Sequence, residues 1–504
     1  MGICLKHRAT NSEDIVYSPN KYRETEGIKD SFSINHTTPY AVISLQEANL
    51  YRFYPKAFWY ASCLSVNAGA DENNDDNKST NYGQIGIATS QMKGEGITIL
   101  NPLINEARLR FEPDIERDAV IYGMKGINGI GDEVAQTIIK NQPYTSIEDF
   151  AARMLDTKLV QNAQMVMLIK AGCFLNLHSQ DRFETMEWYL ERYKYKETEK
   201  LTLQQLNTAD SYGIIPEDLH IYVRYIRFRK YVLDDEGLYE TYVDPNKKVP
   251  KCGYHDRYFI LDDESQAFFT EQFSEDSVIK IVGEHYVISE KAFKKEVENL
   301  IQPLKDWLVL DEANKAYTDA QHKVVWDQFA AGNEAHWSMQ SLTYYDQDHE
   351  LAYINEAMYG VVNFFNLPEQ PEVYETYTRK INGEVKTFNK NKIVRIAGTV
   401  LKSDNTRHTI SLLTCYGVVT VKYSKGQHAF YAKQISRSIG NGKKETIEKS
   451  WFQRGTLLLV AGCRIEDNFR AMVYSDSIYK HTTEKITEVH SDGTLLLQAE
   501  RVKV

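Results

Sequence analysis

Four glycines within nine residues, followed by an amphipathic run, constrain the fold of residues 121–140 (IYGMKGINGIGDEVAQTIIK) more than any other feature of the sequence. Glycines at 123, 126, 129 and 131 permit a tight turn and a close approach of the backbone to a ligand. Apolar residues at 134, 135, 138 and 139 recur with helical spacing, so a helix follows the turn. The order predicts a helix-hairpin-helix element.

Such an element binds phosphate through its backbone, because the N–H groups at the start of the second helix point outward. The candidate contacts to duplex DNA are Lys125, Gly126, Asn128, Gly129 and Gly131. No base edge is read in this mode, so binding would be independent of sequence. An ordinary glycine turn between two helices is the alternative. Residues 146–177 are also predicted to be helical and to form a second, degenerate hairpin unit.

The charge of the chain is unevenly distributed. The net charge is −11, yet residues 386–454 contain fourteen Lys and Arg residues and only three Asp and Glu residues. This segment therefore carries an excess of eleven positive charges, and the remainder is strongly acidic. Charge separation of this kind is typical of proteins that bind nucleic acid. A solvated basic face without a partner is the alternative.

The same basic segment has the sequence pattern of a small barrel. Apolar residues alternate with a period of two in KIVRIAGTVLK, HTISLLTCYG and VVTVKYS, which predicts three strands from residue 392. AFYAKQISRS (429–438) is predicted to be a helix, and TLLLVAGCRI and FRAMVYSDS to be two further strands. Three strands, a helix and two strands are the order of an OB barrel, which binds nucleic acid across its second and third strands. We expect Arg395, Lys402, Arg407 and Lys422 to contact single-stranded DNA, and Tyr423 and Phe430 either to stack on bases or to lie in the core.

The rest of the chain gives weaker signals. Residues 40–58 contain apolar residues at helical spacing, and Pro55 ends this run. Residues 68–83 are acidic and predicted to be a flexible loop. Residues 186–385 are acidic and rich in tyrosine, with short strand-like runs before a predicted long helix at 290–308. YVRYIRFRKYV at 222–232 alternates aromatic and basic residues, as a base-stacking surface or a core element does. No apolar run is long enough to span a membrane, and the six cysteines form no CxxC pair, so we expect a cytoplasmic protein.

Five segments, in the same order along the chain, resemble the C-terminal half of the alpha subunit of bacterial DNA polymerase III, the C-family replicative polymerase. They are FSINHTTPYAVISLQEANLYRFYPKAF (32–58), GITILNPLIN (96–105), IYGMKGINGIGDEVAQTII (121–139), LIKAGCFLNLHSQDR (168–182) and WSMQSLTYYDQDHEL (337–351). They are similar to the end of the family's fingers, the two parts of its tandem hairpin domain and the connector before its OB domain.

The resemblance implies template-directed DNA synthesis by two-metal phosphoryl transfer. It places Asn35, His36, Tyr40 and Ser44 near the incoming nucleotide, although the family's fingers lysine is Ile34 here. The family's catalytic palm precedes the fingers, and only about thirty residues precede Phe32. We therefore expect the palm aspartates and their Mg²⁺ on another chain, no cofactor on this one, and a phage or prophage replisome. Gln340–Tyr344 loosely fits a peptide that binds a sliding clamp.

Two acidic clusters are candidate metal sites. Asp114, Glu116 and Asp118 are spaced two apart, which places three carboxylates on one face of a strand, and Asp346, Asp348 and His349 form a second group. A polar turn is the alternative for the first cluster and a connector for the second. Two alternatives to a polymerase subunit remain. One is a stand-alone accessory protein that reuses the DNA-binding modules, and the other is a metal-dependent nuclease that uses the first cluster.

The expected architecture is multidomain and mixes α and β structure. It consists of the end of the fingers (1–67), the acidic loop (68–83), the tandem helix-hairpin-helix domain (84–185), an α/β insertion with connector (186–385), the OB-fold domain (386–482) and a hairpin tail (483–504).

Overall fold

The computed structural model describes residues 34–70, 79–195, 200–226, 229–233, 240–242, 257–261, 263, 266–267, 278–282, 285–289, 298, 300–439, 444–472 and 482–502. The chain forms two compact units, one within residues 1–186 and 332–504 and the other within residues 187–331. The predicted insertion of 186–385 thus contributes residues to both units.

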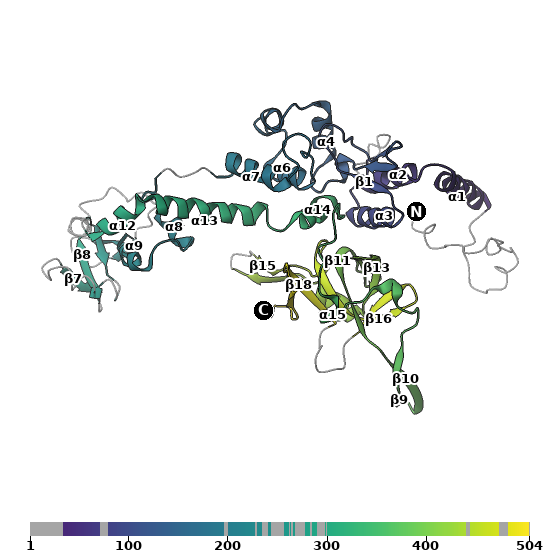
Figure 1. The fold of residues 1–504 in the computed structure, drawn as a ribbon. Helices are drawn as coiled ribbons and strands as arrows, with labels where there is room; N and C mark the ends of the chain where they lie inside the picture. The colour runs from purple at the N-terminus through teal and green to yellow at the C-terminus, as the bar shows by residue number, and fades with distance from the viewer. Residues whose placement is uncertain are drawn as a thin grey trace. The chain divides into compact units, whose positions relative to one another are not determined.

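The N-terminal part of the first unit is mainly helical (Figure 1). Pro55 lacks an N–H and separates the first two helices, which end at Phe53 and begin at Lys56. β3 pairs in parallel with β1 and antiparallel with β2. The elements are α1 (Ile34–Phe53), α2 (Lys56–Ala68), α3 (Tyr82–Gly94), β1 (Thr98–Leu100), β2 (Glu112–Asp114), β3 (Ala119–Ile121), a 3-10 helix (Met124–Gly126), α4 (Asp132–Lys140), α5 (Ile147–Phe150), a π-helix (Ala151–Leu155), α6 (Asn162–Lys170) and α7 (Arg182–Tyr193), whose residues from 187 onward belong to the second unit.

The C-terminal part of the first unit is mainly β-structure. Its elements are α14 (Glu334–Leu342), α15 (Glu356–Tyr359), a 3-10 helix (Phe364–Asn366), β9 (Val373–Ile381), β10 (Glu384–Asn391), β11 (Val394–Asp404), β12 (Thr409–Thr414), β13 (Gly417–Lys422), α16 (Lys425–Ala432), β14 (Ile435–Ser438), β15 (Lys444–Glu448), β16 (Leu457–Ile465), β17 (Asn468–Ala471), β18 (Thr483–Val489) and β19 (Leu495–Gln498).

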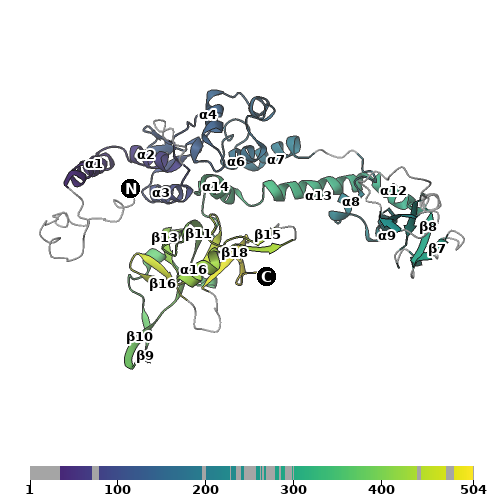
Figure 2. The same ribbon diagram turned by 180° about the vertical axis from the view of Figure 1, so that it is seen from behind.

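Five of these strands close into a barrel in the order β11-β12-β13-β17-β16, with β16 pairing back to β11. The β13–β17 pair is parallel and the other pairs are antiparallel. With α16 between the third and fourth strands, this is the topology of an OB-type barrel, as predicted from the sequence. The views from the front and from behind both show β9 and β10 as a ribbon that projects from the barrel (Figures 1 and 2).

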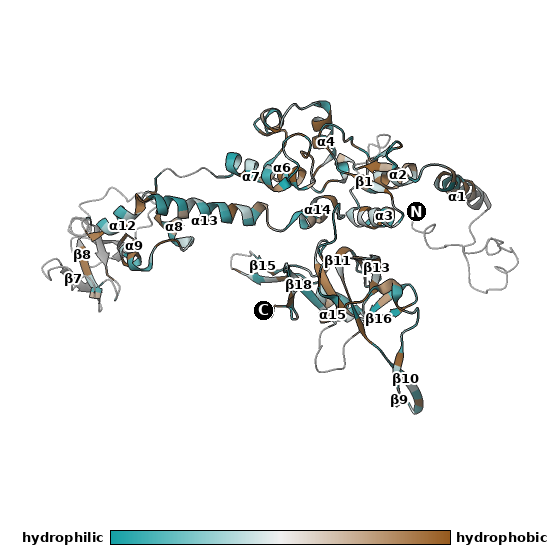
Figure 3. Ribbon diagram, viewed as in Figure 1, coloured by the Kyte–Doolittle hydropathy of each residue, from teal (hydrophilic) through white to brown (hydrophobic). Residues whose placement is uncertain are grey.

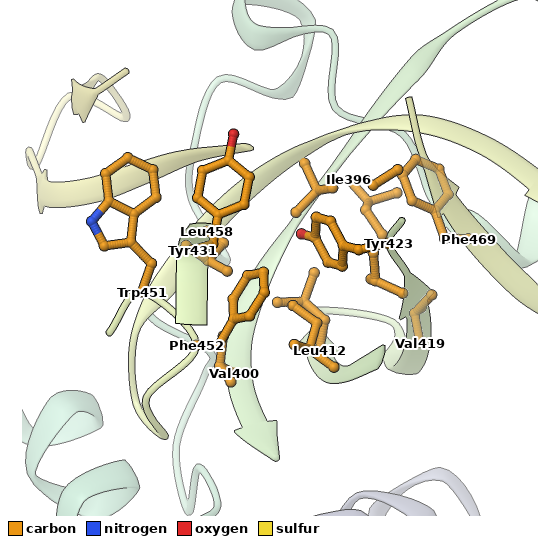
Figure 4. Close-up of a cluster of buried hydrophobic side chains, with 14 of the residues drawn as sticks. Ile396, Val400, Leu412, Val419, Tyr423, Tyr431, Trp451, Phe452, Leu458 and Phe469 are labelled. Carbon is orange, nitrogen blue, oxygen red and sulfur yellow. The ribbon is translucent and has the colours of Figure 1, made fainter. Parts of the chain in front are cut away.

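The barrel is filled by large apolar side chains. Trp451 and Phe469 are completely buried, and the ring of Tyr431 stacks on Trp451 with centroids 5.4 Å apart. Tyr423 lies in the same cluster, where its hydroxyl is 3.0 Å from the Thr483 hydroxyl (Figure 4). Along β11, Ile396 and Val400 lie in this cluster, whereas the next residues, Ala397 and Leu401, lie in two other buried clusters, so both faces of the strand are covered.

Two details of the barrel region differ from the prediction. The expected helix at 429–438 ends at Ala432, and Ile435–Ser438 instead form β14, which pairs with β15. The Ile435–Ser438 segment has a β-branched residue and two serines, which are weak helix formers. The predicted tail hairpin turns at Asp492 and Gly493, but β18 also pairs with β16, so the tail extends the barrel sheet.

α3 packs directly on the barrel because two glycines on one helix face leave room for β11. A Cβ atom at Gly83 would lie 2.8 Å from Lys402 Cβ, and one at Gly86 would lie 2.9 Å from a methyl group of Leu401. Positions three apart share a face of a helix, so both glycines meet the same strand. This contact joins the helical part of the unit to the barrel.

The second unit combines helices with an antiparallel sheet of order β5-β4-β6-β8-β7. Its core includes Leu206, Leu304 and Tyr317. The long helix α13 is coloured as hydrophilic over most of its length (Figure 3). The C-terminal part of the helix predicted at 290–308 is α12, and residues 290–297 and 299 lie outside the described residues. The elements are α8 (Leu206–Ser211), a 3-10 helix (Glu217–Leu219), α9 (His220–Ile226), β4 (Arg229–Leu233), β5 (Glu240–Tyr242), β6 (Arg257–Ile260), β7 (Val278–Val282), β8 (His285–Ser289), α12 (Gln302–Leu308) and α13 (Asp311–Phe329).

Candidate nucleic-acid interface

The glycine-rich segment forms the expected turn before α4. Gly129 has a φ of +81°, a backbone conformation that residues with a side chain rarely adopt, so the turn requires glycine there. Gly131 has an ordinary φ of −80° and immediately precedes α4. No atom lies within 4 Å of a Cβ built at either glycine. Within the described residues, neither backbone N–H has a hydrogen-bond partner, so both are available to an incoming phosphate.

The two other hairpin candidates near the turn are used inside the fold. The Asn128 N–H donates to Ser341 O at 2.8 Å, and its side-chain amide donates to Gln340 O at 3.1 Å. Gly126 is buried beside the Phe111 ring, and a Cβ added to it would lie 2.6 Å from that ring. These residues fix the position of the loop on the C-terminal end of α14, and they present no free donor at the surface.

Lys125 is also committed to an internal contact. Its residue is 8% exposed, and its ammonium lies 2.6 Å from a carboxylate oxygen of Asp132, the first residue of α4. The structure therefore does not leave Lys125 free to meet a phosphate. Sequence reasoning overlooked Asp132, although an acidic residue in the first helical turn, seven positions after the lysine, was a visible signal.

The four barrel candidates fall into two groups. Lys402, Arg407 and Lys422 are exposed, and the Arg407 side chain, 76% exposed, lies 3.8 Å from Asp404. Arg395 instead is 3% exposed, and its guanidinium pairs with Glu484 at 2.8 Å. The expectation that Arg395 lies at a binding face is not met. Its side chain extends from β11 towards β18, where Glu484 neutralises its charge.

The two aromatic candidates of the barrel also differ. Tyr423 is buried in the barrel core, the alternative that the sequence left open, and burial raises the pKa of its phenol. Phe430, on α16, is 56% exposed, and the Arg501 guanidinium lies 6.0 Å from the centroid of its ring. Of the two, only Phe430 presents an aromatic face at the surface.

The candidates near the incoming nucleotide all lie on α1. Tyr40 and Ser44 are exposed, whereas the side chains of Asn35 and His36 lie outside the described residues, although their backbone forms the first turn. Several large apolar side chains of α1 and its C-terminal flank are exposed as well: Tyr40, Val42, Ile43, Leu45, Phe53 and Tyr54.

The acidic clusters are held by other protein groups. Asp114 accepts hydrogen bonds from the N–H and the Nε of Arg117, as the polar turn predicts. Asp346 forms a buried ion pair with Arg182, and His349 binds the Leu413 carbonyl at 3.0 Å. In the part of the chain that the structure describes, no group of three His, Cys, Asp or Glu side chains is placed to hold a metal ion.

The peptide that loosely fits a clamp motif ends α14. Leu342 and Tyr344 are both buried, so their side chains are not available to a partner. Tyr122 donates a hydrogen bond to Leu342 O at 2.6 Å, which ties the same peptide to the hairpin region. Among the described helices, none is both long and apolar enough to cross a membrane.

The chain is similar in sequence to one family profile and to several DNA polymerases. A family profile described as a helix-hairpin-helix motif matches residues 96–185. The chain is 40% identical over 479 residues, 94% of its length, to a probable DNA polymerase, YorL, of Bacillus subtilis and to a DNA-directed DNA polymerase of Bacillus phage SPbeta. It is 32% identical over 149 residues, 28% of its length, to the DNA polymerase III subunit alpha of Campylobacter jejuni.

The matched part of each relative is limited. The chain spans about a third (35%) of the length of the two Bacillus proteins and 11% of the Campylobacter subunit. The helix-hairpin-helix profile and the OB-type barrel agree with the order of segments found in the sequence. By sequence, the chain is therefore similar to part of these two DNA polymerases and, over a shorter stretch, to part of the DNA polymerase III alpha subunit.

Proposed function

We propose that this chain is the DNA-binding part of a polymerase of the DNA polymerase III alpha type, which holds primer and template while a palm on another chain performs synthesis. The observation that carries the proposal is the exposed turn at Gly129 and Gly131, whose N–H groups have no partner among the described residues. The relatives that match nearly the whole chain are DNA polymerases.

The hairpin supports duplex binding through the backbone. Two unpaired N–H groups at the start of α4 suit a phosphate oxygen, and the positive end of the helix favours an anion there. Because Asp132 neutralises Lys125, the loop contributes positioned N–H donors to the interaction and no net positive charge from this lysine. Binding in this mode does not depend on base sequence.

The barrel supports binding of the single-stranded template. Lys402 on β11, Lys422 on β13 and Arg407 in the turn between β11 and β12 are exposed, on the part of the barrel where OB-type folds bind extended strands. About three phosphate contacts would give a slope near −2 for log K against log[salt], since each contact to a single strand contributes about −0.7. A solvated surface without DNA contacts would give no slope.

The partner chain is inferred from the chemistry that DNA synthesis needs. The palm carboxylates would hold Mg²⁺ and supply the phosphoryl-transfer chemistry. The exposed apolar side chains of α1, which include Ile43, Leu45 and Phe53, offer this partner a surface to pack against. The buried side chains of Leu342 and Tyr344 do not support a clamp contact at that peptide.

The hairpin part of the proposal is tested with Gly131→Val. Its φ of −80° accepts valine and the surrounding space is open, so folding should be intact while the side chain blocks the two N–H groups. We expect affinity for duplex DNA, measured by fluorescence anisotropy, to fall about tenfold, or about 1.4 kcal/mol. Gly94→Val, at the end of α3 with similarly open space, is the matched control. Equal affinities of both variants and the wild type would contradict the proposal.

The polymerase part is tested by primer extension. With Mg²⁺ and deoxynucleotides, we expect the purified chain alone to extend no primer and to stimulate a palm-bearing chain from the same genome. Incorporation by the chain alone would place the catalytic carboxylates here. DNA binding without any stimulation of the palm-bearing chain would favour the stand-alone accessory protein.

A further inference from the structure

An open hollow of about 460 Å³ lies where the helical part of the first unit meets the barrel. It is lined by residues 79–83, which lead into α3, by residues 401–403 of β11 and by Arg454. Arg454 is carried by the loop before β16, and two hydrogen bonds of that loop to Val400 hold it against β11: Gly455 N–H to Val400 O at 2.8 Å and Val400 N–H to Thr456 O at 2.9 Å. The wall therefore comes from three separate segments of the chain.

Arg454 is the principal charged group of the hollow. Its guanidinium carbon lies 4.3 Å from the centroid of the Tyr82 ring, which supports the planar group from one side. The side chain is partly buried, and this burial lowers its pKa. Among the described residues, the Tyr82 ring is the contact found for this guanidinium, and none of those that line the hollow carries a carboxylate. Arg454 is of intermediate exposure, and none of its nitrogens is among the buried polar atoms that lack a partner, so the guanidinium still faces solvent and can meet an anion there.

Lys402 supplies a second positive charge on the same wall. Its stem packs against Gly83, and its residue is exposed, so the ammonium is free to move towards the opening. The nearest acid along β11, Asp404, is not part of the lining, and it accepts hydrogen bonds from the N–H groups of Thr406 and Arg407. The described residues of the lining include two cations and no carboxylate.

The neutral groups of the lining are mostly occupied. Thr80 donates its hydroxyl to Ala68 O at 3.0 Å, Asn81 caps α3 by accepting from Gln84 N–H, and Ser403 is 3.2 Å from His428 Nε2. Recognition in the hollow thus depends on the two charges. An arginine fork beside a mobile lysine suits a phosphate group, whose oxygens accept several hydrogen bonds.

The hollow also lies between the two candidate DNA-binding surfaces. The Tyr82 hydroxyl is 3.5 Å from Ile127 O, two residues before Gly129 in the hairpin turn. Lys402 belongs to β11, the first strand of the barrel. Tyr82 and Arg454 therefore connect the loop that is proposed to bind duplex with the barrel that is proposed to bind a single strand.

From this placement we infer that the hollow binds a backbone phosphate of DNA at the junction between duplex and single-stranded template, with Arg454 and Lys402 as its ligands. The inference rests on the proposed function, and it names Arg454 and Lys402 as contacts of the DNA where it passes from the hairpin to the barrel. It predicts a contact that a blunt duplex does not make.

The test uses the full chain and three labelled DNAs of equal length: a blunt duplex, a single strand, and a duplex with a 5′ single-stranded overhang. We expect Arg454→Gln to weaken binding of the overhang DNA about tenfold, to shallow its salt slope by roughly 0.7 to 0.9, and to change blunt-duplex affinity less than twofold. Lys402→Gln, an exposed change that spares the fold, should act in the same direction. Lys449→Gln, which removes an exposed charge outside the hollow, is the matched control.

The outcomes separate this inference from the proposed function. If Arg454→Gln binds the overhang DNA as Lys449→Gln does, while Gly131→Val loses duplex affinity and Lys422→Gln shallows the salt slope of single-strand binding, the junction site is wrong and the proposed function stands. If the wild type binds none of the three DNAs, the proposed function fails. If pyrophosphate raises the melting temperature of the wild type but not of Arg454→Gln, and overhang binding is equal, the hollow takes a free phosphate and the DNA assignment is overturned.

Discussion

The hairpin turn and the barrel both present features of phosphate binding, but they do so with different atoms. At the hairpin, the available donors are backbone N–H groups of Gly129 and Gly131, and the nearby Lys125 is paired with Asp132. At the barrel, the donors are side chains, and Arg395 and Arg501 are buried in ion pairs with Glu484 and Glu448. A count of basic residues therefore overestimates what a surface offers to DNA.

The largest expected effect concerns an arginine that the sequence placed at the binding face. Arg395→Ala leaves Glu484 unpaired in a largely buried position, so we expect a loss of roughly 3–5 kcal/mol in the free energy of unfolding, measured by urea denaturation. Lys422→Gln is the matched control, because this exposed change should leave stability nearly unaltered and shallow the salt slope of single-strand binding by about 0.7. A stable Arg395→Ala protein with a reduced slope would reverse these assignments.

A smaller effect is the pH dependence of stability at His349, whose ring contacts the barrel strand β12. Burial lowers the pKa of His349 to about 4, and its ring accepts from Leu351 N–H at Nδ1 while Nε2 lies 3.0 Å from Leu413 O. The folded pKa is below the unfolded value, so the unfolded state binds the proton more tightly as the pH falls below about 6.5. We expect stability to decline by about 1 kcal/mol per pH unit between pH 6 and 4 from this residue.

The check for His349 is a difference between proteins, because carboxylates also titrate in the acid range. Urea midpoints at pH 7, 6 and 5 should depend less on pH in His349→Gln than in the wild type. His490→Gln, in which an exposed histidine beside Glu488 is replaced, should reproduce the wild-type profile. Parallel profiles for all three proteins would show that His349 titrates normally in the fold.

The smallest expected effect sharpens the description of the hairpin. Asp132→Asn removes a negative charge from the first turn of α4 and releases Lys125, so duplex affinity should rise about two- to threefold at low salt. Glu133→Gln removes the same charge from the same turn without releasing the lysine. An equal gain in both variants would assign the effect to the helix terminus alone, and no gain in either would place the DNA elsewhere.

Sequence reasoning recovered the elements whose pattern is local. The turn at Gly129 follows from glycine spacing, and the barrel follows from the alternation that places Ile396, Leu412 and Val419 inside. Contacts between distant segments left no such pattern. Nothing near Arg395 in the sequence indicates Glu484, and nothing near Arg454 indicates Tyr82, because each pair meets only after the fold forms. The end of α16 was also misplaced, since pairing with β15 overrides the weak local preference at Ile435–Ser438.

The ribbon of β9 and β10 has a consequence for the behaviour of the chain at high concentration. A two-stranded sheet has two outer edges, and unpaired edges recruit strands from other molecules. Both strands are exposed along most of their length and bear Lys380, Lys386 and Lys390, with Lys390 paired to Glu375 at 2.6 Å. Charged side chains at these positions oppose edge-to-edge association of two copies. Lys386 and Lys390, which belong to the basic excess of residues 386–454, thus oppose such pairing on a ribbon that also exposes Tyr374 and Val385.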